Sequence, residues 1–583
     1  MAERETARTG GAARGGKAAS GQGGAPETPD RNAAIWFAAD GYDPAAKGVN
    51  GRRMAGESFL RGWFRHAQVP EFVALTHGPT DAALFADWAR EMAPHRPART
   101  VRLDSPAAMA PVGAVWYSGP NYAPEVWRRA VHGATRWSMV GLTHTMSTKA
   151  VMQGVFDLRC APHQAWDAVI CTSRAVRAAM DYQLDQVDAY LRARFGPALP
   201  PRWQMPVIPL GVDCDAFRPD PAAGRALRAR LGIAEGDVAA LVVARLSPHE
   251  KFDPLPLYIA LAEAQRTMPA GRRLHLVLYG NAPDDYSKRV FERGAAGLMP
   301  DVGYHPLPHD GAAARLAALS AADMFLFPID NLQESFGIAP VEAMAAGLPV
   351  IASDWDGIRD TVDGAGGIRI PTCGARPEHT VLTGLRHFGG TDSYVQYLSQ
   401  MSAVTQIDVP RLAEAIGALA RDDGRRKAMG QAAAARARRL FDWSVVVPQV
   451  QDLIAELAAI RARADAADHP PVPPVALPVA PAPMALFAGF PTAPFSAEGR
   501  RFRAVALGTR PDAAGTLDLR DYLGMRRIFE EEAHVKAVLA AITAAGAEGA
   551  GAAGLARATG LHPLKVDRIL LWLLKYHFIE GDP

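Results

Sequence analysis

Two stretches of the sequence alternate short apolar runs with longer segments of helical spacing, and this alternation limits the fold more than any other feature. In the first stretch, the runs predicted as strands are AIWFAAD, EFVALT, GAVWYS, SMVGLT, AWDAVICTS and MPVIPLG. The pattern restarts after DAFRPDPAAG, where the predicted strands are VAALVVARL, LHLVLYG, MFLFPI and GLPVIASD. Strands separated by helices form parallel sheets with helices on both faces. The sequence therefore predicts an α/β protein with two doubly wound domains.

Composition sets the predicted domain boundaries. Residues 1–30 are rich in Gly, Ala, Arg and Thr and contain almost no large apolar side chain, so we expect a disordered tail. We assign an N-terminal Rossmann-like domain to residues 31–218 and a C-terminal one to residues 219–463, whose last part has helical spacing. Residues 464–500 include DHPPVPPVALPVAPAP, and this much proline predicts an extended linker without helix.

Residues 501–583 are predicted to form a third, small helical module. Two short helical patterns broken at Gly560 indicate a helix-turn-helix, and LARATGLHPLKVDRILLWLLKYHFIE is similar to winged-helix repeats. The apolar side chains of this segment form mostly a core face, and the module has about as many acidic as basic residues. Since DNA-binding modules need a basic surface for phosphate, we favour a protein-interaction module over a DNA-binding one.

Charge and hydropathy exclude several classes of protein. The 63 Lys and Arg residues balance 61 Asp and Glu residues, a net charge of +2 that predicts no general attraction to nucleic acid or anionic lipid. The sequence has no long apolar run that could span a membrane, and MAERETARTGGAARGG lacks the apolar core of a signal peptide. The 4 cysteines show no C-x-x-C spacing. We expect a cytoplasmic protein with reduced thiols and no transmembrane segment.

The stretch NLQESFGIAPVEAMAAGLPVIASDWDGIRDTV is the most informative about function. It begins after the run MFLFPI and includes the next predicted strand, so it must supply the loop and helix between two parallel strands. Pro340 suits the first turn of this helix and Gly347 its C-terminal end, which predicts a start near Gly337. Helix N-termini at the carboxyl ends of strands suit phosphate groups. Two carboxylates, Glu334 and Glu342, flank this point.

This stretch resembles family 4 of the retaining glycosyltransferases, which have the GT-B fold of two Rossmann-like domains facing a cleft. The family motif E-x-F-G-x-x-x-x-E reads Glu334-Ser335-Phe336-Gly337 through Glu342 here, and the following A-x-G-x-P-V-I-A-S also fits. The resemblance implies that Glu342 binds the donor ribose, that Glu334 contacts the transferred sugar, and that the backbone from Ser335 to Gly337 lies against the donor phosphates. Two solvated surface glutamates are the alternative interpretation.

Upstream, the segment VVARLSPHEKFDPL is similar to the family's strand followed by an arginine, a short loop and a lysine. The resemblance implies that Arg245 and Lys251 bind the diphosphate. Fixed cations at this place would stabilise the charge that grows on the leaving group. The family usually has glycine after the lysine, whereas this chain has Phe252. Outside this context, the two cations would be interpreted as a solvated pair.

Two features of the first domain extend the resemblance. The segment AKGVNGRRMAGESFLRGWF resembles the glycine-rich loop after the first strand and implies that Gly48 and Gly51 bind the donor, with Asn50 and Arg52 as further candidates. The family's adjacent Gly-Gly is replaced here by Gly-Val-Asn-Gly, and an ordinary turn is the alternative. His144 follows SMVGLT, where the family often has a histidine facing the transferred sugar; a structural histidine is the alternative.

Two D-x-D patterns, Asp213-Cys-Asp215 and Asp354-Trp-Asp356, superficially match the metal-binding motif of other glycosyltransferases. The first lies at the predicted junction of the two domains. The family that this chain resembles generally needs no metal, so we expect no metal ligand and no cofactor.

The resemblance covers roughly residues 32–460 and implies a hexosyltransferase that acts with retention of configuration. The second domain would bind a nucleotide-sugar donor and the first an acceptor, which is a glycan, a lipid or a small molecule. Residues 501–583 would bind a protein partner, and a nucleic-acid partner is not expected. The main alternative is an inactive scaffold or regulator that acts through this module. An epimerase or a phosphorylase of the same fold is a further alternative, although no lysine stands out as a site for pyridoxal phosphate.

Overall fold

The structure is a computed structural model that describes residues 31–43, 51–464, 468–520, 522 and 529–582. The predicted tail, residues 1–30, lies outside the described residues. The chain divides into two compact units, one ending at Pro473 and the other beginning at Pro474.

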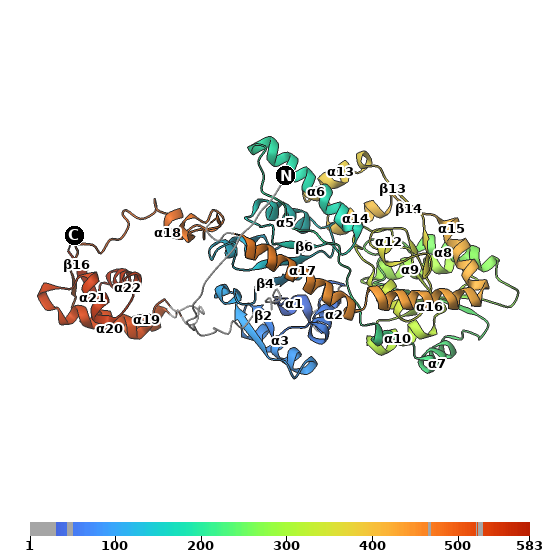
Figure 1. Cartoon of the computed structure of the whole chain (residues 1–583), viewed down its shortest axis with the longest axis horizontal. Coiled ribbons are helices and arrows are strands. Elements are labelled where there is room, and N and C mark those ends of the chain that lie inside the picture. Colours follow the sequence, from blue (N-terminus) through green and yellow to red (C-terminus); the bar gives the residue numbers. More distant parts are fainter. Residues whose placement is uncertain (1–30, 44–50, 465–467, 521, 523–528, 583) are drawn as a thin grey trace, which may run out of the picture. The chain divides into compact units, whose positions relative to one another are not determined.

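A six-stranded parallel sheet forms the centre of the first domain (Figure 1). In the order β3-β2-β1-β4-β5-β6, its strands are β3 (Ala98–Arg102), β2 (Phe72–Thr76), β1 (Ala34–Phe37), β4 (Ala114–Tyr117), β5 (Ser138–Leu142) and β6 (Ala168–Ile170). Every residue of β2, β4, β5 and β6 is buried, as expected where helices cover both faces of a parallel sheet. The main helices of this domain are α2 (Gly51–His66), α3 (Pro79–Met92), α4 (Ala123–Ala130), α5 (Lys149–Cys160) and α6 (Arg174–Phe195).

Two sequence-based expectations fail in this sheet. The run MPVIPLG is not a strand: it contributes one isolated bridge, between Cys171 and Val207, because its two prolines lack the amide donors that a ladder needs. Strand β3 was not predicted, because its sequence ARTVR is charged and largely exposed at the sheet edge. Only Val101 is buried there.

A second six-stranded parallel sheet forms the centre of the second domain. In the order β12-β11-β10-β7-β8-β9, its strands are β12 (Gly367–Ile370), β11 (Val350–Ser353), β10 (Met324–Phe327), β7 (Val238–Val243), β8 (Leu274–Tyr279) and β9 (Gly303–Leu307). The chain runs outward from β7 to β9, returns to the middle at β10, and then runs outward to β12. The strand order therefore reverses between β7 and β10, and open α/β sheets bind ligands at such a switch point. The predicted fold class, two doubly wound α/β domains and a helical C-terminal region, is confirmed.

Helices cover the second sheet as well. They are α7 (Pro221–Leu231), α8 (Pro254–Arg266), α9 (Asp285–Leu298), α10 (Gly311–Ala321), α11 (Ile338–Ala345), α12 (Ile358–Thr361), α15 (Val409–Arg421) and α16 (Asp423–Leu440). Between β12 and α15 the chain makes an excursion through β13 (Thr372–Gly374), α13 (Val381–Phe388), α14 (Tyr394–Ser402) and β14 (Thr405–Ile407). The hydroxyls of Tyr394 in this excursion and Ser147 in the first domain lie 2.7 Å apart.

The long helix α17 (Trp443–Arg463) packs against α2 and β5 of the first domain. Its Trp443 indole nitrogen donates a hydrogen bond of 2.8 Å to the Ser58 hydroxyl of α2. Its Arg461 donates hydrogen bonds to the Gly113 carbonyl and the Ser138 hydroxyl. Although α17 falls within the predicted second domain, it therefore joins the two domains. The boundaries at residues 218 and 463 stay predictions.

The second unit begins in the proline-rich segment. This segment contains a short turn of 3-10 helix (Pro474–Ala476) and a single helical turn, α18 (Pro483–Leu486), so the expectation of a segment without helix is wrong at these two places. A proline in the first turn of a helix is tolerated because its missing amide would have no partner there.

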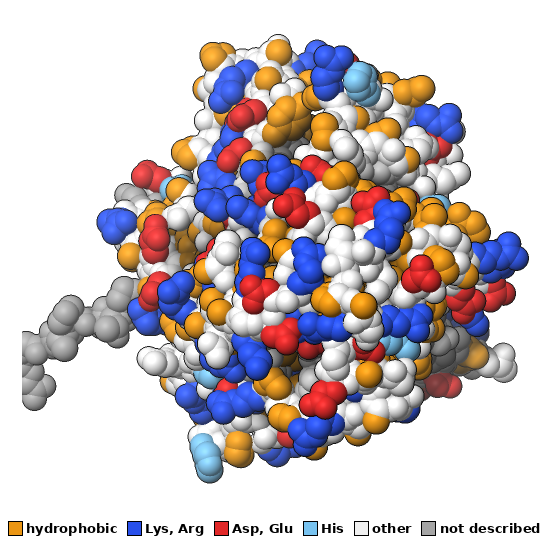
Figure 2. Space-filling model, turned by 90° about the vertical axis from the view of Figure 1, so that its right-hand side faces the viewer, with side chains coloured by type: hydrophobic (Ala, Val, Ile, Leu, Met, Phe, Trp, Pro, Cys, Tyr) orange, Lys and Arg blue, Asp and Glu red, His pale blue; other side chains and the backbone are white. Residues whose placement is uncertain are grey.

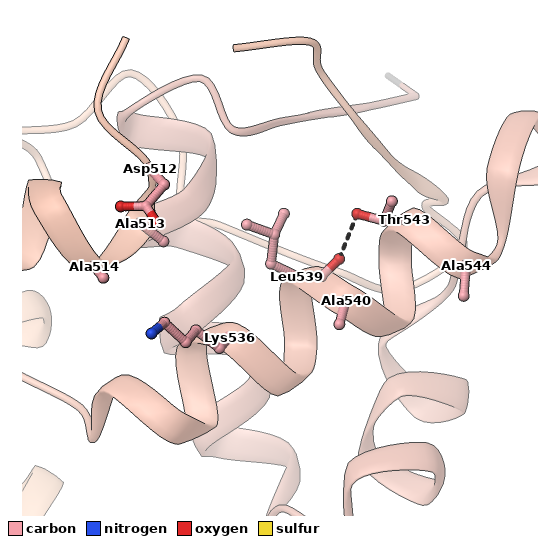
Figure 3. Close-up of a pocket in the computed structure, with 8 residues that line it drawn as sticks. All are labelled: Asp512, Ala513, Ala514, Lys536, Leu539, Ala540, Thr543 and Ala544. Atoms are coloured by element: carbon pink, nitrogen blue, oxygen red, sulfur yellow. Dashed lines mark hydrogen bonds between the residues drawn. The ribbon is translucent and has the colours of Figure 1, made fainter.

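The rest of the second unit is helical, with a two-stranded antiparallel ribbon. Its elements are β15 (Phe502–Ala504), α19 (Ala513–Arg520), α20 (Glu532–Ala544), α21 (Ala552–Thr559), α22 (Pro563–Lys575) and β16 (Ile579–Gly581). The predicted break at Gly560 is confirmed, since this residue follows α21 with a φ of +69°. A hollow of about 470 Å³ lies between α19 and α20, with Asp512 and Lys536 at one end (Figure 3).

Candidate functional site

The loops that follow β7 and β10 meet at the switch point of the second sheet. The two strands are direct neighbours and parallel, so both loops leave from the same edge. The Asn331 side chain donates to the His249 carbonyl at 3.0 Å, and the Asp253 amide donates to the Asp330 carboxylate at 3.4 Å. These bonds hold the segment with Arg245 and Lys251 against the segment with Glu334.

An ion pair joins the two loops at the centre of the site. The Lys251 ammonium lies 2.5 Å from Glu334 Oε2 and 5.2 Å from the centre of the Phe327 ring. The other carboxylate oxygen, Oε1, accepts a 2.9 Å hydrogen bond from the Gly337 amide. Burial alone would raise the pKa of Glu334, but Lys251 and the backbone amides of Gly337 and Phe336 together lower it. The carboxylate is therefore ionised at neutral pH.

Helix α11 begins and ends as the sequence predicts. Gly337 precedes it with a φ of +87°, a conformation that suits glycine, and Gly347 follows it with a φ of +81°. The amides of Gly347 and Leu348 donate to the carbonyls of Met344 and Ala343, the two bonds of a Schellman motif. The N-terminus of α11 therefore lies beside Glu334.

Arg245 lies at the rim of the same site. Its guanidinium donates to Gln333 Oε1 at 3.1 Å and lies 3.0 Å from the Glu250 carboxylate. Because its side chain is 42% exposed, an anionic ligand could reach it. The residue after Lys251 departs from the family pattern because Phe252 is a core residue, buried edge-on against the ring of Phe291.

Glu342 forms a separate pair within the second domain. It lies on α11, is buried, and accepts a hydrogen bond from Arg315 of α10. Burial lowers the pKa of Arg315 to about 10, so the arginine stays charged at neutral pH. Arg315 was not among the predicted site residues, although it is the only charged residue of its helix, GAAARLAALSA. A lone charge in an apolar helix is a signal that could have identified it.

The first domain contacts this site through the loop after β5. The Ser335 hydroxyl, which is buried, donates a hydrogen bond to the backbone carbonyl of His144. The structure thus brings His144 next to the E-x-F-G segment, through its backbone. Gly51 is the first residue of α2. Gly48 and Asn50 lie outside the described residues, as does the Arg52 side chain.

The D-x-D carboxylates have different surroundings. Asp213 caps a short 3-10 helix (Cys214–Phe217) and lies 2.5 Å from Arg65. Asp354 lies 3.4 Å from Arg369 and 3.7 Å from Arg359. Among the side chains that the structure describes, no group of three or more His, Cys, Asp or Glu residues is arranged to hold a metal ion.

Taken together, the site combines cations and helix amides that can bind an anion with carboxylates that can accept hydrogen bonds from hydroxyl groups. The structure brings together Lys251 with Glu334, Arg245 with Gln333, and Ser335 with His144.

On the face of the molecule in Figure 2, basic and acidic side chains are interspersed. In the described part of the chain, no helix is long and apolar enough to cross a membrane.

Comparison with known proteins gives three kinds of match. The family described as "Glycosyl transferases group 1" matches residues 239–377. GDP-mannose-dependent alpha-(1-6)-phosphatidylinositol monomannoside mannosyltransferase of Mycobacterium tuberculosis is 34% identical over 184 residues, which cover 30% of this chain and 45% of that protein. D-inositol 3-phosphate glycosyltransferase of Kineococcus radiotolerans is 31% identical over 346 residues, which cover 58% of this chain and 70% of that protein.

The chain thus spans less than half the length of the mannosyltransferase and 70% of the length of the Kineococcus protein. Among solved structures, sucrose-phosphate synthase from Thermosynechococcus elongatus is 18% identical, with a TM-score of 0.46. This likeness covers 74% of this chain and 100% of that one.

Proposed function

This chain belongs to the family of group 1 glycosyltransferases, and from that premise we propose that it transfers a hexose from a nucleotide-sugar donor to an acceptor with retention of configuration. The observation that carries this proposal is the Lys251–Glu334 pair, 2.5 Å apart, at the switch point of the second sheet. A cation paired with a carboxylate that accepts from the amide at a helix N-terminus suits a ligand that combines phosphate with hydroxyl groups.

The proposed roles follow from the charges of the groups. Breaking the bond between sugar and phosphate leaves negative charge on the diphosphate, which Arg245, Lys251 and the amides at Gly337 would stabilise. Glu334 would orient the transferred sugar by accepting hydrogen bonds from its hydroxyls. The acceptor hydroxyl would attack from the face that the diphosphate leaves. Loss of the cation in Lys251→Met should lower the rate of transfer by about a hundredfold.

The remaining predicted residues complete the donor site in this proposal. Glu342 would accept hydrogen bonds from the ribose hydroxyls, and Ser335 and Phe336 would contribute backbone to the phosphate region. Gly48 and Gly51 would approach the donor from the first domain, and His144 would bind a hydroxyl of the sugar. Closure of the two domains over the donor would exclude water and limit hydrolysis.

Thermal stabilisation by free nucleotides tests this proposal. A nucleotide at a hundred times its dissociation constant should stabilise the protein by about 2.7 kcal/mol. GDP is the first choice, because a mannosyltransferase relative is named as GDP-mannose-dependent, and UDP, ADP and CMP complete the set. Stabilisation by one nucleotide, lost in Glu342→Ala, would support the donor site. If none of the four stabilises the protein, the inactive scaffold becomes the better interpretation.

We also propose that the second unit is a winged-helix-like module that binds a protein partner. Strand β16 follows the helix pair α21 and α22 directly and pairs with β15, which precedes α19 to α22, so a ribbon accompanies the helix pair as in such modules. The face of α22 with Ile569, Leu570 and Leu573 is buried in the module, so it is not available to a DNA groove. Fluorescence anisotropy with duplex DNA at physiological salt should show no binding; tight binding would contradict this role.

A further inference from the structure

The loop after β11 contains a carboxyl group that the proposed mechanism does not use. Asp356 is the second carboxylate of the Asp354-Trp-Asp356 pattern. Its φ is +42°, in the left-handed region that side chains other than glycine rarely adopt. Among the described residues other than glycine, only His577 shares a positive φ. Strained backbone of this kind persists where the surrounding structure enforces it, and it is concentrated at functional sites.

Close packing against the E-x-F-G segment enforces this conformation. A Cβ atom on Gly357 would lie 2.3 Å from the Ser335 carbonyl oxygen and 2.6 Å from the Phe336 Cα atom, so the two backbones touch. The Trp355 indole nitrogen donates a 3.1 Å hydrogen bond to the Asn331 carbonyl. The loop that carries Asp356 is therefore fixed on the loop that carries Glu334.

The carboxyl group of Asp356 lacks part of its hydrogen bonding. Its Oδ1 atom is buried and has no hydrogen-bond partner among the described residues. Buried polar atoms are nearly always paired, and an unpaired one costs free energy. Burial, and then the nearby charge of Glu334, raise the pKa of Asp356 to about 8, although the Gly357 amide and the Ser173 hydroxyl act in the opposite direction. At neutral pH the group is therefore mostly an uncharged carboxylic acid.

The charged neighbours of Asp356 are already engaged. Lys251 pairs with Glu334, and Asp360 accepts hydrogen bonds from the backbone and side chain of Arg174. Asp356, whose Oδ1 lacks a partner, is thus an uncharged carboxyl group beside the ionised carboxylate of Glu334. An uncharged carboxyl suits a hydroxyl group, which can donate to one of its oxygens and accept from the other.

We propose that Asp356 binds a hydroxyl group of the transferred sugar and thereby helps to select which sugar the enzyme accepts. This inference rests on the proposed function and deepens it. The sugar hydroxyl would supply the partner that Oδ1 lacks, next to the carboxylate of Glu334. In this role, the strained backbone positions the Asp356 carboxyl group, which a glycine at this place would lack.

Calorimetric titration of the full chain with paired ligands tests this role. The pairs are GDP with GDP-mannose and UDP with UDP-glucose, since each pair differs only in the sugar. Asp356→Gly removes the carboxyl and suits the left-handed backbone. In this variant, the dissociation constant of the nucleoside diphosphate should stay within about twofold of wild type, and that of the nucleotide sugar should rise about tenfold. The melting temperature should not fall, because the substitution relieves backbone strain.

Two further variants serve as controls. Asp356→Asn keeps a side chain that can donate and accept, and asparagine tolerates this conformation, so it should lose less sugar affinity than the glycine variant. Asp354→Asn changes the other carboxylate of the same loop and should leave both dissociation constants unchanged.

The outcomes separate this inference from the proposed function. If wild type binds a nucleotide sugar and Asp356→Gly binds it equally well, the role of Asp356 is overturned and the donor site stands. If wild type binds none of the four ligands, the donor site itself is overturned, and the role of Asp356 with it. A loss of nucleoside diphosphate affinity equal to the loss of sugar affinity would also contradict a contact with the sugar.

Discussion

At the scale of single residues, the site is organised by charges that are paired before any ligand arrives. Lys251 lies against Glu334, and Arg315 lies against Glu342, each pair joining two different elements. Pairing limits the rotation of both carboxylates, so each can present an oxygen to a hydroxyl group. Removing one partner of such a pair destabilises the folded protein, because the other charge is then left buried without compensation.

Replacing Arg315 with methionine should destabilise the protein by about 3 kcal/mol, because the buried Glu342 carboxylate would lose its cation. Arg315→Lys should recover part of this loss. Thermal unfolding measures the effect, and donor titration should show weaker binding in the methionine variant. Arg266→Met is the control: Arg266 is 75% exposed on α8, and its loss should change stability by less than about 0.5 kcal/mol. Equal effects at the two sites would contradict the importance of the buried pair.

At the scale of secondary structure, glycines predicted the ends of helices correctly. Gly337, Gly347 and Gly560 all stand at helix ends and all have positive φ. Strands β9 and β12 were missed because they are only partly buried, so they lack the continuous apolar run of their neighbours. The prolines of MPVIPLG prevented a strand that its apolar character alone had suggested.

Gly347→Ala should lower the melting temperature, because alanine costs about 1 to 2 kcal/mol in the left-handed conformation. No atom lies within 4 Å of the added methyl, so the cost comes from the backbone alone. Gly297→Ala is a matched control with the opposite sign. Gly297 lies within α9, also in open space, and the added methyl should stabilise the helix by about 0.5 to 1 kcal/mol. A melting temperature unchanged in Gly347→Ala would contradict the expected strain.

Strands β8 and β9 should make stability depend on pH. His275 Nδ1 lies 3.0 Å from His305 Nε2, and His275 Nε2 lies 3.1 Å from the Asp237 carboxylate. Burial lowers the pKa of His275, although Asp237 opposes this, and burial also lowers the pKa of His305. Below about pH 6.5 the unfolded chain therefore binds protons that the folded chain does not, and stability falls as the pH falls.

Melting temperatures between pH 7.5 and pH 5.5 measure this dependence. His305→Gln removes one of the two histidines and should show a smaller decrease over this range than wild type. His379→Gln replaces an exposed histidine and should leave the decrease unchanged. The explanation fails if His305→Gln loses as much stability on acidification as wild type does.

At the scale of the whole molecule, α17 links the two domains of the first unit. Trp443 stands at its start, and the space for this indole depends on two glycines. A Cβ atom on Gly62 would lie 2.5 Å from Trp443 Cγ, and one on Gly211 would lie 2.4 Å from Trp443 Cδ2. The helix therefore reaches the first domain only because these positions have no side chain.

Gly62→Ala should destabilise the first unit by about 1 to 3 kcal/mol, because the methyl overlaps Trp443 in a packed interior. Limited proteolysis should then cut more readily near α17, and the melting temperature should fall. Gly236→Ala adds the same methyl where nothing lies within 4 Å and should do neither. Equal melting temperatures for the two variants would show that Trp443 can move aside at no cost.

The sequence by itself determined the features that depend on neighbouring residues along the chain. It determined the repeated alternation of strands and helices, the ends of α11, the break at Gly560 and the family motif that starts at Glu334. These features are local because hydrophobic periodicity and glycine conformation act over a few residues.

Only the tertiary structure decided which distant groups meet. The strand order brings the loop after β7 to the loop after β10, and the packing of the helices places Arg315 against Glu342 and α17 against the first domain. It also fixes Asp356, which the sequence marked only as part of a discounted D-x-D pattern, in a strained conformation beside Glu334. No local pattern could predict these contacts, because they depend on how the chain crosses between strands and on which side chains share a buried space.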